Sequence, residues 1–157
     1  RMSIGKEYGA QNGDSYQINP ENFEKAKKEM DDLMNIEQEV KIRMIKESGA
    51  RVGISVKPNT PIEEIYEYLP YIHMCLIMTV EPGKGGQTLI TDMLDKISKL
   101  KSYIDGNNLE IDIQVDGGIN LKTAPRVKQA GANILVAGTA ILAATDYKVI
   151  IDELKLV

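Results

Sequence analysis

The 157-residue sequence has no tryptophan, one cysteine and one histidine, and the scarcity of cysteine and histidine limits the disulfides and metal ligands that it can supply. With Cys75 alone, no internal disulfide can form, which weakly favours a reducing compartment. With His73 alone, the sequence cannot supply two histidines to a metal. Basic residues (19) do not exceed acidic ones (23), so the net charge is −4 and nucleic acid is disfavoured as the main partner.

Long apolar runs are also missing. The longest apolar stretches are far shorter than a membrane span, and residues 1–15 lack the apolar segment of a signal peptide. We therefore expect a cytoplasmic protein without a membrane partner. A small phosphorylated ligand stays possible, because backbone N–H groups can hold a phosphate without net positive charge.

The order of predicted elements indicates the fold class. Residues 1–19 are polar and predict loop or irregular structure, and Asn19-Pro20-Glu21 begins one or two helices over 20–48. After Gly49, short apolar runs alternate with helical patterns. We predict strands at 52–56, 74–80, 109–115 and 134–137, and helices at 61–69, 90–104, 121–130 and 146–155, with a short helix opening at Gly138.

This alternation predicts an α/β fold with a parallel sheet. The continuous apolar run 74–80 predicts a strand that is buried on both faces. A doubly wound sheet and a (β/α)8 barrel both remain open, but a whole barrel needs roughly 200 residues or more, so four units would make half of one. We expect two parts, an N-terminal irregular and helical segment at 1–48 and the α/β part at 49–157.

Glycine-bearing loops follow three of the predicted strands, at 79–87, 116–120 and 138–139. In parallel α/β folds, sites form where the carboxyl ends of the strands meet. Gly138-Thr139, which opens a helix, has the chemistry of a phosphate cradle, with unpaired N–H groups and a helix dipole. Taken singly, such glycines are more often turns than ligand contacts.

Taken together, the same segments resemble the ribulose-phosphate 3-epimerase family. Residues 78–87, M-T-V-E-P-G-K-G-G-Q, are similar to the family signature M-T-V-x-P-G-x-G-G-Q. Residues 115–119, V-D-G-G-I, and 136–141, V-A-G-T-A-I, resemble the segments at its seventh and eighth strands. Residues 46–58 look like its fourth helix and fifth strand. The resemblance covers about 37–157 and implies a (β/α)8 barrel relative of which this chain supplies strands five to eight.

The resemblance implies an isomerase that interconverts ribulose 5-phosphate and xylulose 5-phosphate by moving a proton at carbon 3 through an enediolate. Such a reaction needs two opposed acid/base groups and a stabilised oxyanion. It also implies a divalent metal (Zn, Fe, Mn or Co) and makes Asp116 the seventh-strand acid/base and a metal ligand. The implied substrate-binding residues are Met78, Gly83, Lys84, Gly85, Gly86, Gly117, Gly118, Gly138 and Thr139.

The sequence departs from the family in its first half. The first-strand serine, the second-strand H-x-D-x-M-D-G segment and the third-strand histidine are not found, and Lys84 stands where an aromatic is common. We therefore expect the isolated chain to be catalytically incomplete, with a non-catalytic phosphate-binding half-barrel or assembly partner as the alternative. Because a half-barrel leaves two strand edges unpaired, we also expect a homo-oligomer or an edge covered by residues 1–48.

Overall fold

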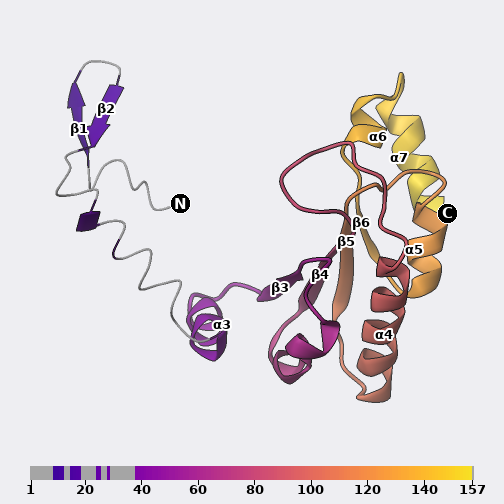
Figure 1. Cartoon of the computed structure of the whole chain (residues 1–157), viewed down its shortest axis with the longest axis horizontal. Coiled ribbons are helices and arrows are strands. Elements are labelled where there is room, and N and C mark those ends of the chain that lie inside the picture. Colours follow the sequence, from indigo (N-terminus) through magenta and orange to yellow (C-terminus); the bar gives the residue numbers. More distant parts are fainter. Residues whose placement is uncertain (1–8, 13–14, 19–23, 26–27, 29–37, 157) are drawn as a thin grey trace. The chain divides into compact units, whose positions relative to one another are not determined.

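The computed structural model describes part of the N-terminal region and nearly all of the remainder (Figure 1). The chain divides into two compact units, Arg1–Arg43 and Met44–Val157, and the division falls within helix α3 (Gln38–Glu47). The described residues are 9–12, 15–18, 24–25, 28 and 38–156.

The first unit contains an antiparallel hairpin of β1 (Gly9–Asn12) and β2 (Ser15–Ile18), with Asn12 opposite Ser15. Our prediction of irregular structure over 1–19 was therefore wrong for 9–12 and 15–18, and the rest of that range lies outside the described residues. Each strand is four residues long, and apolar residues alternate with polar ones only in β2, at Tyr16 and Ile18, so the period-2 signal is too short to identify a hairpin. The dipeptide between the paired Asn12 and Ser15 is Gly13-Asp14, and a glycine followed by an aspartate is a two-residue hairpin signal that we overlooked. The predicted helix over 20–48 is confirmed at its C-terminal end by α3, and most of its remainder lies outside the described residues.

The second unit is built on a four-stranded parallel sheet in the order β3-β4-β5-β6, which confirms the α/β alternation (Figure 1). Within the described ranges, no helix combines the length and apolarity that crossing a membrane would need. The strands are β3 (Gly53–Val56), β4 (Met74–Met78), β5 (Asp112–Asp116) and β6 (Ile134–Val136). The helices are η1 (Ile62–Tyr71), α4 (Met93–Gly106), α5 (Ala124–Ala130), α6 (Thr139–Leu142) and α7 (Tyr147–Leu156).

One predicted helix differs in type. The segment predicted as a helix over 61–69 is a 3-10 helix, η1, which contains Pro70. Proline lacks the N–H that an α-helical bond needs, and it disfavours α geometry in the residue before it. Pro70 therefore favours an end to the helical segment near its position, and η1 ends at Tyr71.

The core lies between the sheet and the helices along one of its faces, where α4 packs against α5 and η1 (Figure 1). Along β4 and β5, buried and half-buried residues alternate strictly, so the prediction that β4 is buried on both faces was wrong for one face. Each fully buried aliphatic side chain contributes about 1.5–3 kcal/mol. The buried set from the strands and helices is Cys75, Ile77, Ile113, Val115, Ile97, Leu100 and Val127.

His73 joins two strands at the end of the sheet where β4 begins. Its ring Nδ1 accepts a hydrogen bond from Val52 N (3.2 Å), and its own N–H donates to Val52 O (2.8 Å). These bonds fix the start of β3 against β4. The structure thus gives His73 a structural role, at the end of β4 opposite to the carboxyl end.

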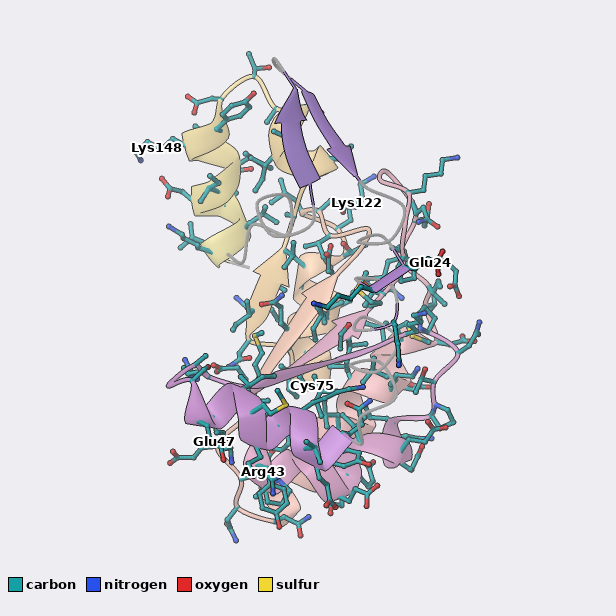
Figure 2. All side chains as sticks on the ribbon, turned by 90° about the vertical axis from the view of Figure 1, so that its left-hand side faces the viewer. Glu24, Arg43, Glu47, Cys75, Lys122 and Lys148 are labelled. Atoms are coloured by element: carbon teal, nitrogen blue, oxygen red, sulfur yellow. The ribbon has the colours of Figure 1, made fainter. Side chains whose placement is uncertain are left out.

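Cys75, labelled in Figure 2, is fully buried in β4, and burial raises the pKa of its thiol from 9.0 to about 12. The stability that this shift contributes is complete below pH 9 and is lost as pH rises from 9 to 12. Reaction with a disulfide reagent at pH 8 should be slower in the native chain than in urea by about 10³-fold or more, because thiolate is the reactive form. Equal rates in buffer and in urea would contradict this.

Candidate functional site

A pocket of about 680 Å³ lies at the carboxyl ends of β4, β5 and β6. Its lining residues come from three segments, each beginning at the last residue of a strand, at 78–89, 116–123 and 136–143. The strand register explains why they meet. Met78 is the neighbour of Asp116 across the sheet, and Asp116 is the neighbour of Val136. All three end their strands in one row, so the loops that follow open on the same edge.

The turn after β5 requires glycine because the loop after β4 presses on it. Gly117 has φ +120°, and a Cβ there would lie 2.4 Å from Val80 Cγ2. Gly118 has φ +66°, and a Cβ there would lie 2.4 Å from the backbone N of Leu89. Both values of φ are rare for residues with a side chain, and both distances are far below contact. Close packing between the two loops is thus sufficient reason for this glycine pair.

Two polar side chains that we did not predict hold the turn from its other side. Thr123 Oγ1 donates to Gly118 O (2.8 Å) and accepts from Asn120 N (2.9 Å). Asn120 Oδ1 accepts from Lys122 N (2.9 Å) and Thr123 N (3.2 Å). An asparagine three residues before a threonine, directly ahead of a helix, is a capping pattern that could have indicated this network.

Gln87 closes the loop after β4. Its side-chain Nε2 donates to Glu81 O and to Lys84 O, both at 2.7 Å, so both amide hydrogens are used within the loop. The loop's Gly83 and Gly85 would have no heavy atom within 4 Å of an added Cβ. The shape of the loop therefore depends on Gln87. Gln87 stands in the quoted signature, but sequence reasoning gave it no role.

The third side of the pocket is the start of α6, at Gly138 and Thr139. Gly138 has an ordinary φ of −94°, and a Cβ there would meet nothing within 4 Å. Its conformation and packing thus do not demand glycine, in contrast to Gly117 and Gly118. The helix has only four residues, so its dipole is weak, and the anion-binding chemistry expected here reduces to backbone N–H groups and the Thr139 hydroxyl.

All ten residues predicted for the site line this single pocket. They are Met78 at the end of β4, Gly83, Lys84, Gly85 and Gly86 in its loop, Asp116, Gly117 and Gly118 after β5, and Gly138 and Thr139 at α6.

The charge of the lining limits how it could hold an anion. The charged side chains among the lining residues are Lys84, Glu81 and Asp116, one positive and two negative. An anion held here would therefore depend mainly on backbone donors, with Lys84 as the one cation of the lining. Lys122, labelled in Figure 2, belongs to the turn after β5 but does not line the pocket.

The described residues do not form a complete metal site. Among them, no three histidine, cysteine, aspartate or glutamate side chains gather closely enough to hold an ion. Asp116 is half-buried and lines the pocket, so it could serve as one ligand. His73 lies at the other end of β4 and is bonded to Val52, so it cannot complete the set.

The two kinds of glycine in this pocket predict opposite effects of alanine. Gly118→Ala should lower the free energy of unfolding by about 2–4 kcal/mol, from left-handed strain and the collision with Leu89. Gly138→Ala should change it by less than about 0.5 kcal/mol, because the added methyl meets open space. Urea unfolding of both variants measures this. Equal destabilisation by Gly118→Ala and Gly138→Ala would contradict the close packing of Gly118 against Leu89.

Comparison with known proteins matches this chain to one family. The model of the "Ribulose-phosphate 3 epimerase family" matches residues 22–142. A ribulose-phosphate 3-epimerase of Eremothecium gossypii is 43% identical over 114 residues, covering 73% of this chain and 46% of that protein.

The corresponding enzyme of Bacillus subtilis is 42% identical over 115 residues (73% of this chain, 53% of that protein). That of Escherichia coli is 36% identical over 114 residues (73% and 51%). The chain thus spans about half the length of the curated relatives it matches. Its matched region includes all three loops of the pocket, and the chain belongs to the ribulose-phosphate 3-epimerase family.

Proposed function

We propose that this chain carries the phosphate-binding site and one acid/base group of a ribulose-phosphate 3-epimerase. The reaction is the interconversion of ribulose 5-phosphate and xylulose 5-phosphate, in cytoplasmic carbohydrate metabolism. The observation that carries the proposal is the meeting of three glycine-bearing loops in one pocket beside a carboxylate. Family membership supports the reaction class.

In this proposal, backbone N–H groups hold the phosphate. The donors come from the turn at Gly117 and Gly118 and from the start of α6 at Gly138 and Thr139. The low net charge of the pocket lining is compatible with phosphate binding of this kind, because N–H groups oriented by the fold bind phosphate without formal charge. Lys84, exposed in the loop after β4, adds the one cation. Met78, next to Asp116 in the sheet, would contact the sugar.

Asp116 is proposed as the acid/base group. It ends β5 in the middle of the row formed by the three strand ends, with loops on both sides. A carboxylate in this position could remove or return the proton at carbon 3 from one face of the sugar. Epimerisation also needs a group on the opposite face, and we propose that this group comes from outside the described residues. A divalent metal would likewise need ligands beyond Asp116.

One observation favours a second candidate, a phosphate-binding half-barrel without catalysis. Asp116 and Glu81 are the only carboxylates among the lining residues, and Glu81 Oε1 accepts a hydrogen bond from Asn59 Nδ2 (3.3 Å) outside the pocket. This leaves one carboxylate to act on substrate. Such a chain would bind the same ligand and would act as an assembly partner, as a homo-oligomer or with another chain.

Calorimetric titration with ribulose 5-phosphate tests the shared part of both candidates. We expect binding at millimolar ligand or below, and competition by inorganic phosphate. Asp116→Asn should leave binding within about threefold, because in this proposal the carboxylate acts on the sugar rather than on the phosphate. Absence of binding by the folded wild-type chain at millimolar ligand would contradict the proposed phosphate-binding site. An epimerase assay on the same samples separates the two candidates.

A further inference from the structure

The turn that carries Asp116 is held by a buried hydroxyl outside the pocket. Thr79, the residue after β4, is fully buried, and its Oγ1 lies 2.6 Å from Gly117 O and 2.9 Å from Asp116 O. A hydroxyl has one proton, so the shorter contact to Gly117 O is the main bond and the other its weaker branch. Thr79 is not among the lining residues of the pocket, so its hydroxyl acts on the turn and not on a ligand.

Thr79 is itself fixed by its backbone. Its N–H donates to Asp116 O (2.8 Å), and its carbonyl accepts from Ile90 N (2.9 Å). Thr79 therefore joins the end of β4, the end of β5 and the segment that leads to α4. A side chain held in this way can hold another group in place without moving itself.

The geometry of the peptide group carries this constraint into the pocket. The two peptide bonds of the turn are trans, so each N–H points opposite to the carbonyl of the same peptide plane. Drawing Asp116 O and Gly117 O toward Thr79 therefore turns the N–H groups of Gly117 and Gly118 away from Thr79. These two residues line the pocket.

Without this hold, the peptide between Gly117 and Gly118 would have alternatives. Glycine on both sides removes the steric barriers that normally fix a peptide plane. The hydrogen bond from the buried Thr79 hydroxyl to Gly117 O restricts the rotation of this peptide plane, which the two glycines would otherwise allow. The same bonds fix the backbone of Asp116, from which the carboxylate projects.

We propose that Thr79 is a positioning residue, which orients the Gly117 and Gly118 N–H groups toward the phosphate and fixes the backbone of Asp116. This inference rests on the proposed function for its ligand. Its geometric part, the orientation of the turn, stands without a ligand and is measured separately below.

Two substitutions separate the hydroxyl from the size of the side chain. Thr79→Val keeps the shape and removes the O–H, whereas Thr79→Ser keeps the O–H and removes a methyl. We expect Thr79→Val to weaken binding of ribulose 5-phosphate about tenfold, the size of one lost hydrogen bond, and Thr79→Ser to retain it within about threefold. Val127→Ala, a buried substitution in α5, serves as a control that lowers stability while the affinity is retained.

The turn itself is followed by the amide resonances and hydrogen exchange of Gly117 and Gly118 without ligand. We expect Thr79→Val to shift the Gly118 resonance and speed its exchange, and Thr79→Ser to restore both. The Gly117 amide should change less, because the backbone N–H of residue 79 still donates to Asp116 O in every variant. If Thr79→Val does not fold, Thr79→Cys, with a weak donor at the same place, supplies the comparison.

A folded hydroxyl-free variant with wild-type amide resonances and affinity would overturn the inference. If wild-type chain binds no pentulose phosphate, the proposed function fails. The amide measurement then still decides whether Thr79 sets the turn.

Discussion

Gly138→Asp should abolish binding of ribulose 5-phosphate, with a loss of about 100-fold or more. Gly138 lines the pocket with open space where a side chain would begin, so an aspartate would extend into the volume assigned to phosphate. Its charge would add repulsion to the steric block, and water screens part of this repulsion because Gly138 is exposed. The backbone there has an ordinary φ of −94°, so folding should be preserved.

Two control variants make this result specific. Gly138→Asn has the same shape without the charge and should lose less affinity than Gly138→Asp. Gly106→Asp carries the same charge at the end of α4, where an added Cβ meets nothing within 4 Å, and should bind as wild type. Titration of all three, with thermal unfolding as the check on folding, measures the effect. Wild-type affinity in folded Gly138→Asp would exclude the start of α6 from the phosphate site.

The second large effect concerns turnover. The 157-residue chain on its own should epimerise ribulose 5-phosphate at least about 10²–10⁴-fold more slowly than ordinary enzymes, because its described residues offer one positioned acid/base group at the pocket where two are needed. Asp116→Asn should remove the little activity that remains and leave phosphate binding intact. A coupled assay for xylulose 5-phosphate measures this. Turnover of roughly 1–10³ per second that Asp116→Asn abolishes would contradict it.

Much of the pocket could be predicted because its signals are local. A strand ending in glycines is visible within ten residues of sequence, and parallel strands bring such ends to one edge. The residues 78–87, 116–118 and 138–139 are of this kind, and the structure brings them together. The strand bounds were less accurate. Leu109 was predicted to start a strand, but its N–H donates to Ile104 O at the end of α4, which delays β5 until Asp112.

Other features depend on residues far apart in sequence, which no local pattern reveals. Lys96 Nζ donates to the carbonyls of Lys57, Pro58 and Thr60 at 2.6–3.0 Å, and thereby holds the loop after β3 to α4. Burial lowers the pKa of this ammonium. Thr79 acts across a similar separation on the turn after β5.

The role of each glycine also could not be predicted from the residues beside it in the sequence. Gly117, Gly118 and Gly138 look alike in sequence, but only the first two are required by packing against Val80 and Leu89. Whether a glycine serves a turn, a close approach or a ligand depends on what lies beside its missing Cβ. That neighbour is set by tertiary structure and not by the flanking residues.

The proposed phosphate-binding site is tested most directly by following backbone amide resonances while ribulose 5-phosphate is added to the wild-type chain. The amides of Gly117, Gly118, Gly138 and Thr139 should shift together along one saturable curve, and inorganic phosphate should shift the same set. The amides of Gly49 and Gly106, which do not line the pocket, should stay in place. Saturable shifts elsewhere with these four unmoved, or no shifts at millimolar ligand, would contradict a phosphate site at the carboxyl ends of β5 and β6.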